Sequence, residues 1–158
     1  MINININFIK DELIKDGWQD TAPGRYMDID FDLIVSRHII YVDRWEILIK
    51  ELPELNRKNM DKWLRRFEEI KENSKNLPIR KCFVLCLLAE KVSGEAWDFA
   101  QSQNLFNAGE ISLKEGTGNL LMADIKEKKV YGQIPEKPYD MYVFSNNLKK
   151  IITDAFGR

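Results

Sequence analysis

The sequence predicts an α/β protein in which helices flank a central mixed β-sheet. Two extended runs, 26–36 and 40–52, precede a strongly amphipathic helical pattern at 56–73. The segment "KCFVLCLLA" (81–89) is apolar on both faces, as expected of a strand covered on both sides. An apolar strand between helical segments is typical of a layered sheet rather than of a bundle or a β-sandwich. The 158 residues are expected to form one domain, 1–158.

The first elements are a helix and a hairpin. Asn7 is the expected N-cap of a helix that ends at Gly17. The turn between the runs 26–36 and 40–52 is short, which favours a hairpin. The apolar stripe of the helix is expected to consist of Phe8, Ile9, Leu13 and Ile14.

The long helix at 56–73 has the most regular pattern in the chain. Asn56 is its expected N-cap, and apolar residues follow at helical spacing, so one face is predicted to pack on the sheet. These residues are Met60, Trp63, Leu64, Phe67 and Ile70.

The elements after the apolar strand are expected to be shorter. Ser93 is the predicted cap of a helix. Next come a hairpin that turns at "EGTGN" (115–119) and an extended run, Val130–Ile134. A last helix is expected to begin at Ser145 or Asn146.

Composition sets the expected cellular setting. A net charge of -1 argues neither for nor against nucleic acid as a partner. Cys82 and Cys86 lie about 13 Å apart along one strand, too far to form a disulfide, so a reducing cytoplasm is expected. The first 15 residues lack the pattern of a signal peptide, and the longest apolar run is too short to span a membrane. No membrane association is therefore predicted.

Aspartates occupy every second position of the first extended run, although aspartate is a poor strand former. A three-residue turn at 37–39 would keep the apolar residues of both strands on the opposite face. In that register Asp32 lies opposite Arg44, and Asp30 lies opposite Glu46. The polar face of the hairpin would then carry Asp28, Asp30, Asp32, Arg44, Glu46 and Lys50.

This polar face has two interpretations. Carboxylates directly across a ladder repel each other unless a positive group lies between them, and a divalent metal ion is one such group. Alternatively, the face is hydrated, with Asp32 and Arg44 as a cross-strand ion pair.

The order of the elements resembles the core of the restriction-endonuclease-like superfamily, the PD-(D/E)XK nucleases. The matching features are a helix that ends in "DGW" (16–18), a strand with "FDLIV" (31–35), a strand with "EILIK" (46–50), and then the amphipathic helix and the apolar strand. The resemblance covers about residues 7–104. It leaves about 105–158 as a C-terminal β/α extension.

The resemblance implies a set of site residues. In that family an aspartate on one hairpin strand and a Glu-x-Lys on the next hold Mg²⁺ and orient the attacking water. Asp30 or Asp32 is the implied aspartate, and Lys50 is the implied lysine. Leu48 stands two residues before Lys50, where the family has an acid, and leucine offers a metal ion no oxygen. Either Glu46 replaces this acid, completing a metal site with Asp30 and Asp32, or the site is inactive.

Two functions are therefore predicted. The first is a non-catalytic or degenerate nuclease-fold protein that binds nucleic acid, another protein or a second copy of itself. The alternative is a Mg²⁺-dependent nuclease that hydrolyses phosphodiester bonds in DNA or RNA. A nucleic-acid surface needs clustered basic side chains, and the long helix offers them on its predicted solvent side, where an ordinary solvated face is the other interpretation. They are Lys58, Lys62 and Arg65, with Arg66 at the edge.

Overall fold

The computed structural model describes residues 4–22, 24–40, 43–74, 80–102, 118–131 and 140–158. In chain order the elements are α1 (Ile6–Lys15), β1 (Gln19–Asp20), β2 (Arg25–Tyr26), β3 (Ile29–Asp30), β4 (Leu33–Ile40), β5 (Asp43–Leu55), α2 (Arg57–Asn73), β6 (Arg80–Val92), α3 (Gly94–Ser102), β7 (Gly118–Asp124), β8 (Lys129–Tyr131) and α4 (Asp140–Ala155).

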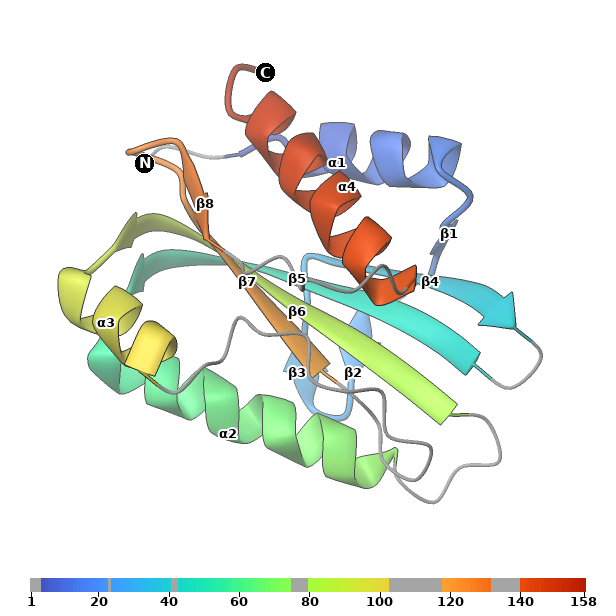
Figure 1. The fold of residues 1–158 in the computed structure, drawn as a ribbon, viewed down its shortest axis with the longest axis horizontal. Coiled ribbons are helices and arrows are strands. Elements are labelled where there is room, and N and C mark those ends of the chain that lie inside the picture. The colour runs from blue at the N-terminus through green and yellow to red at the C-terminus, as the bar shows by residue number, and fades with distance from the viewer. Residues whose placement is uncertain (1–3, 23, 41–42, 75–79, 103–117, 132–139) are drawn as a thin grey trace.

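A mixed sheet of six strands forms the middle layer, with helices on both faces (Figure 1). The strand order is β1-β4-β5-β6-β7-β8. The central strands β5, β6 and β7 are parallel, whereas β4 and β8 run antiparallel to their neighbours. Helices α1 and α4 cover one face, and α2 and α3 lie on the other. This arrangement confirms the predicted α/β fold with a central mixed sheet flanked by helices.

Strand β6 is the most enclosed element. It pairs with β5 on one side and β7 on the other, and every residue from Phe83 to Ala89 is buried. Alternate side chains point to opposite faces, so β6 supplies both halves of the core. This confirms the interpretation of the apolar segment as a central strand.

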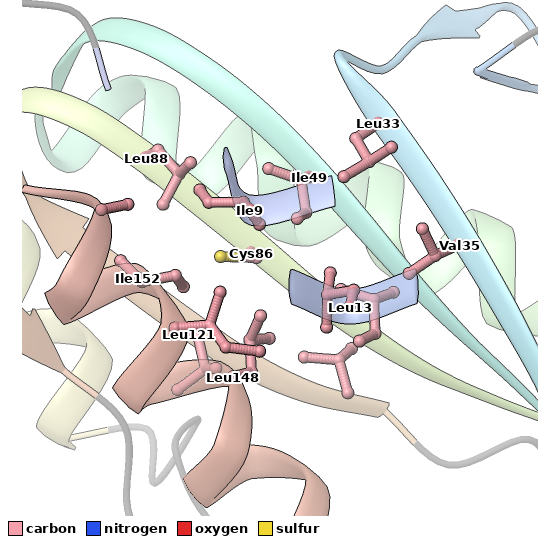
Figure 2. Packing of buried hydrophobic residues seen from close by; sticks show 14 of the residues in the cluster. Ile9, Leu13, Leu33, Val35, Ile49, Cys86, Leu88, Leu121, Leu148 and Ile152 are labelled. Atoms are coloured by element: carbon pink, nitrogen blue, oxygen red, sulfur yellow. The ribbon is translucent and has the colours of Figure 1, made fainter. Parts of the chain in front are cut away.

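The core between the sheet and the α1–α4 layer is shown in Figure 2. Ile9 and Leu13 project from α1, and Leu148 and Ile152 project from α4. They meet the apolar side chains of four strands, which include Leu33, Val35, Ile49, Cys86, Leu88 and Leu121.

Helix α1 begins two residues earlier than predicted. Asn5, not Asn7, is the N-cap, and its side chain accepts a hydrogen bond from the Phe8 amide at 3.0 Å. Gly17 adopts a φ of 97° after the last turn, a conformation that favours glycine. Ile14 is 44% exposed, so its predicted place in the core is wrong.

Helix α2 matches its prediction closely. Asn56 is the N-cap, and it exchanges side-chain-to-backbone hydrogen bonds of 2.7 and 3.0 Å with Asn59. Met60, Phe67 and Ile70 are buried against the sheet, while Trp63 and Leu64 of the same stripe are only half-buried.

The aspartate-rich run is not one continuous strand. Strands β2 and β3 form a small separate hairpin that turns at Met27 and Asp28, where Met27 has a φ of 57°. The chain enters the large sheet only at Leu33, the first residue of β4. Aspartate is common in turns, and the conformation of Met27 ends the extended run that the alternation predicted.

The predicted register of the hairpin is wrong. His38, not Asp32, lies opposite Arg44, a shift of six residues, and Ser36, not Asp30, lies opposite Glu46. The predicted turn at 37–39 belongs to β4 instead. An even shift leaves the paired side chains of β4 and β5 on their predicted faces, so the apolar pattern of these two strands alone does not distinguish the two registers. Ile29 and Phe31, which precede β4, lie instead in the core on the opposite face, with Leu48.

The last third of the chain also differs from its prediction. The hairpin of β7 and β8 turns at 125–128, and Asp124 accepts hydrogen bonds there from the amides of Glu127 (2.8 Å) and Val92 (3.0 Å). Most of the predicted turn at 115–119, and the end of the predicted run Val130–Ile134, lie outside the described residues. Helix α4 begins at Asp140, before the predicted Ser145 or Asn146. Among the described residues, no helix is both long and apolar enough to cross a membrane.

Candidate functional site

Asp32 lies where β4 begins and β5 approaches its end. Its amide donates to the Ile49 carbonyl at 2.9 Å, and its Oδ2 accepts from the Glu51 amide at 2.6 Å. The side chain is exposed but hydrogen-bonded to the backbone of the neighbouring strand. These two hydrogen bonds of Asp32 connect the start of β4 to β5.

The other two aspartates and Lys50 hold the small β2–β3 hairpin. Asp28 forms a salt bridge with Arg66 of α2, and Asp30 faces Arg25 at 3.7 Å. The Lys50 ammonium donates to the backbone carbonyl of Asp30 at 2.8 Å. The Arg66 guanidinium holds the pKa of the Asp28 carboxyl below its usual value, mainly through the hydrogen bond between them. The contacts of Asp28 and Lys50 link the hairpin to α2 and β5, whereas the Asp30–Arg25 pair lies within the hairpin.

Glu46 lies away from this region. It is opposite Ser36, four residues along β4 from Asp32, which corresponds to a separation of about 13 Å along the strand. Leu48, between Glu46 and Lys50, is 0% exposed. The structure therefore brings Asp30, Asp32 and Lys50 together but does not add Glu46 to them. Within the described residues, no group of three His, Cys, Asp or Glu side chains is arranged to hold a metal ion.

Glu46 is instead the centre of a buried polar group, the Glu46 cluster, which consists of Ser36, Arg44, Glu46 and Lys81. Glu46 Oε1 lies 3.3 Å from Arg44 Nε and 3.6 Å from Lys81 Nζ. The Glu46 side chain is 4% exposed, against 32% for Arg44 and 20% for Lys81. Arg44 also donates to Ser36 Oγ at 3.2 Å.

Two atoms of the Glu46 cluster are buried without a hydrogen-bond partner: Arg44 Nε and Glu46 Oε2. Arg44 Nε is close to Glu46 Oε1, so the ion pair is formed, but its geometry is poor for a hydrogen bond. Unpaired buried polar atoms are rare in folded proteins and destabilise the state that contains them. The Glu46 cluster is therefore the least satisfied polar part of the described interior.

Glu51 is a residue that the sequence-based prediction missed. Burial raises the pKa of its carboxyl, and the neighbouring Asp32 carboxylate raises it further, while a hydrogen bond from the Ile4 amide and the Lys50 charge lower it. Strand alternation puts Glu51 on the opposite face from Lys50, so a search of one face did not find it. The proximity of its amide to the Asp32 carboxylate appears only in the folded register.

Glu51→Gln is expected to stabilise the protein at neutral pH. A raised pKa means that the folded state binds the proton more tightly than the unfolded state, so stability falls as the pH rises through the ordinary value of 4.5 to the folded value. The neutral glutamine side chain does not lose stability in this way. The variant is therefore expected to be more stable than wild type at pH 7 and equally stable near pH 3. Urea unfolding at both pH values measures it. Glu54→Gln, an exposed carboxylate of the same strand, is the control, and an equal gain there contradicts the assignment to Glu51.

The predicted basic stripe lies on the exposed side of α2, but its charges are partly neutralised. Lys58 and Lys62 are exposed. Arg65 pairs with Asp61 at 3.0 Å, and Arg66 pairs with Glu69 at 2.9 Å as well as with Asp28. The positive charge available to a ligand is greatest at Lys58 and Lys62.

No protein-family model, no curated protein and no solved structure matches this chain.

Proposed function

We propose that this chain is a non-catalytic protein of nuclease-like architecture that acts in the cytoplasm by binding nucleic acid. The order α1, β1, β4, β5, α2, β6 supports the nuclease-like architecture. It is a helix, three strands of the sheet, a helix and a strand, with β4 and β5 antiparallel and β5 and β6 parallel. This is the element order on which the resemblance to the PD-(D/E)XK nucleases rests.

The burial of Leu48 is the observation that supports a non-catalytic function. Leu48 is fully buried in the core under α2, between Ile34 of β4 and Leu85 of β6. No oxygen ligand is available where the family has its second acid. Lys50 and Asp32 are hydrogen-bonded to the backbone at 2.8 and 2.6 Å, so both have structural roles that need no metal ion.

The binding surface is the α2 stripe, defined as Lys58, Lys62 and Arg65. All three side chains are exposed on one side of the helix. Phosphate contacts need basic groups that reach a polyanion together, and each contact adds to the salt dependence of binding. Arg66 contributes less, because it already holds Asp28 and Glu69.

The second candidate is the Mg²⁺-dependent nuclease, and one observation favours it. Asp32 lies next to Glu51, whose amide donates to Asp32 Oδ2 and whose carboxyl pKa the Asp32 charge raises, so two carboxylates lie near each other on neighbouring strands. Mg²⁺ often uses one or two carboxylates together with substrate phosphates and water. In this alternative Glu51 would supply the second carboxylate from the face of β5 opposite position 48 and Lys50.

Binding is tested with labelled single-stranded DNA, double-stranded DNA and RNA over a range of salt concentrations. Lys62→Glu with Arg65→Glu is expected to weaken binding strongly and to lower the slope of log affinity against log salt by about two, one for each lost phosphate contact. Lys126→Glu with Lys150→Glu makes the same charge change at exposed positions outside α2 and is expected to retain binding. Absence of wild-type binding, or an equal loss in both variants, would overturn the nucleic-acid proposal.

The catalytic alternative is tested on the same substrates with Mg²⁺ or Mn²⁺. The wild-type protein is expected to leave them intact. Metal-dependent cleavage that disappears in Lys50→Ala would establish the nuclease and refute the non-catalytic assignment. Lys71→Ala, a lysine of α2 paired with Glu68, is the matched control for a contaminating activity.

A further inference from the structure

The β2–β3 hairpin (residues 25–30) is a small element that the core holds weakly. It contains two paired residues in each strand, and a two-stranded ribbon is marginally stable by itself. Ile29 is its one buried residue, whereas Arg25, Met27, Asp28 and Asp30 are exposed. Segments with few buried apolar contacts open locally at a lower free energy than the core.

The base of the hairpin is firmly closed. The Phe31 amide donates to the Gly24 carbonyl at 2.7 Å, and Phe31 is buried and in ring contact with Trp63 at 6.2 Å. A Cβ atom at Gly24 would lie 2.9 Å from the Phe31 carbonyl oxygen. The two chain segments therefore approach each other too closely there for a larger residue to fit without a backbone shift. Any local opening is therefore confined to residues 25–30.

Contacts made by side chains attach the hairpin to α2, β5 and β6. Asp28 at the tip pairs with Arg66 of α2, and the Asp30 carbonyl accepts from Lys50 of β5. On β2, Tyr26 packs edge-on against Phe83 of β6 with 5.6 Å between ring centroids. Salt bridges and hydrogen bonds of this exposed kind stabilise weakly and are screened by salt.

Tyr26 also contacts the Glu46 cluster through Lys81. Lys81 Nζ lies 3.5 Å from the Tyr26 hydroxyl and 3.6 Å from Glu46 Oε1, and so connects the hairpin to the buried carboxylate. The same ammonium lies 5.3 Å from the centre of the Tyr26 ring. In the same cluster, Arg44 Nε and Glu46 Oε2 are buried and have no hydrogen-bond partner. Opening of the hairpin removes the Tyr26 contact from Lys81, and water that then reaches the cluster satisfies these two atoms, which favours opening.

We propose that the β2–β3 hairpin is a clasp that opens as a unit about the Gly24–Phe31 base and exposes Lys81 and the Glu46 cluster to solvent. The Asp28–Arg66 salt bridge holds the clasp shut. Opening exposes Ile29 and the partly buried Tyr26, and leaves the other residues of the core under α2 packed between that helix and the six-stranded sheet. The clasp is independent of the α2 stripe.

Residue-resolved hydrogen exchange of the full chain tests the clasp. Arg66→Ala is expected to speed exchange of the amides in 25–30 by about two- to fivefold, the range that a partly exposed ion pair supports, without a change at Phe31 or in β6. Arg65→Ala removes the Arg65–Asp61 pair of the same helix, which does not touch the hairpin, and is the matched control. Added salt is expected to speed exchange in the wild type and to have less effect in Arg66→Ala.

Amine labelling of Lys81 gives a second measurement. Under conditions where the protein stays folded, Arg66→Ala is expected to raise the labelling rate of Lys81 by the same factor as the hairpin amides, while that of Lys62 stays unchanged. Two results would overturn the proposal. One is exchange of residues 25–30 at the same rate as the amides of β6, which means that they open only when the whole protein unfolds. The other is an equal effect of Arg65→Ala and Arg66→Ala.

Discussion

Leu48→Glu is expected to destabilise the protein by more than about 4 kcal/mol rather than to restore a metal site. Leu48 is 0% exposed and lies between Ile34 and Leu85 on the neighbouring strands. A glutamate there loses the apolar contacts of leucine and places a carboxyl group where no cation contacts it. Either the buried carboxyl remains protonated at a large cost, or the chain unfolds around it.

Equilibrium unfolding in urea measures this loss, and Leu48→Met is the matched control. Methionine nearly conserves volume and polarity, so its cost is expected to stay below about 1.5 kcal/mol. A Leu48→Glu protein that unfolds at the wild-type urea concentration and gains Mg²⁺ binding would contradict the buried position. It would also favour the alternative function, the Mg²⁺-dependent nuclease, over the non-catalytic one.

The faces of β5 were predictable from the sequence, and its pairing was not. Trp45, Ile47 and Ile49 occupy every second position of β5, and all three are buried as expected. The position of the turn sets the register, and a turn at 37–39 gives the same faces as the observed pairing of His38 with Arg44. Leu48 is an apolar residue on the face of β5 that was predicted to be polar. Such residues indicate that this face packs in a second core rather than being hydrated.

The candidate site was harder to predict because its partners come from distant elements. Asp28 pairs with Arg66 from α2, and Glu46 pairs with Lys81 from β6. Strand alternation predicts the face of a side chain and says nothing about which helix or strand lies above it. The prediction of the α2 stripe needed only the local spacing of its residues. Its exposed position follows from the 3.6-residue period of a helix.

The C-terminal third shows the same limit. Val130 was expected in an extended segment and lies in β8, but the parallel pairing of β7 with β6 joins residues more than thirty positions apart, such as Leu85 and Leu120. Parallel strands are joined by crossovers, whose length hides the pairing from local patterns.

Arg44→Met with Lys81→Met is expected to destabilise the protein by about 3–5 kcal/mol, the range for a buried charge that has lost its partners. Glu46 is 3% exposed as a residue, and the two cations that contact it are these basic groups. Without them no basic side chain within the described part of the chain pairs with its buried carboxylate. Lys81→Met alone is expected to cost less, because Arg44 remains 3.3 Å from Oε1.

Adding Glu46→Leu to this double variant is expected to recover most of the lost stability. Replacing a whole buried ion cluster with apolar side chains is often neutral or stabilising, whereas removing only the partners leaves an uncompensated charge. Glu46→Leu alone is expected to be nearly neutral, since Arg44 and Lys81 are partly exposed and their charged ends can be hydrated. Urea unfolding of the three variants separates these cases. If the double variant lies within about 1 kcal/mol of wild type, the Glu46 carboxylate reaches water and the cluster is not buried in solution. If the triple variant is no more stable than the double, the loss comes from packing of the Arg44 and Lys81 side chains rather than from the charge that they compensate.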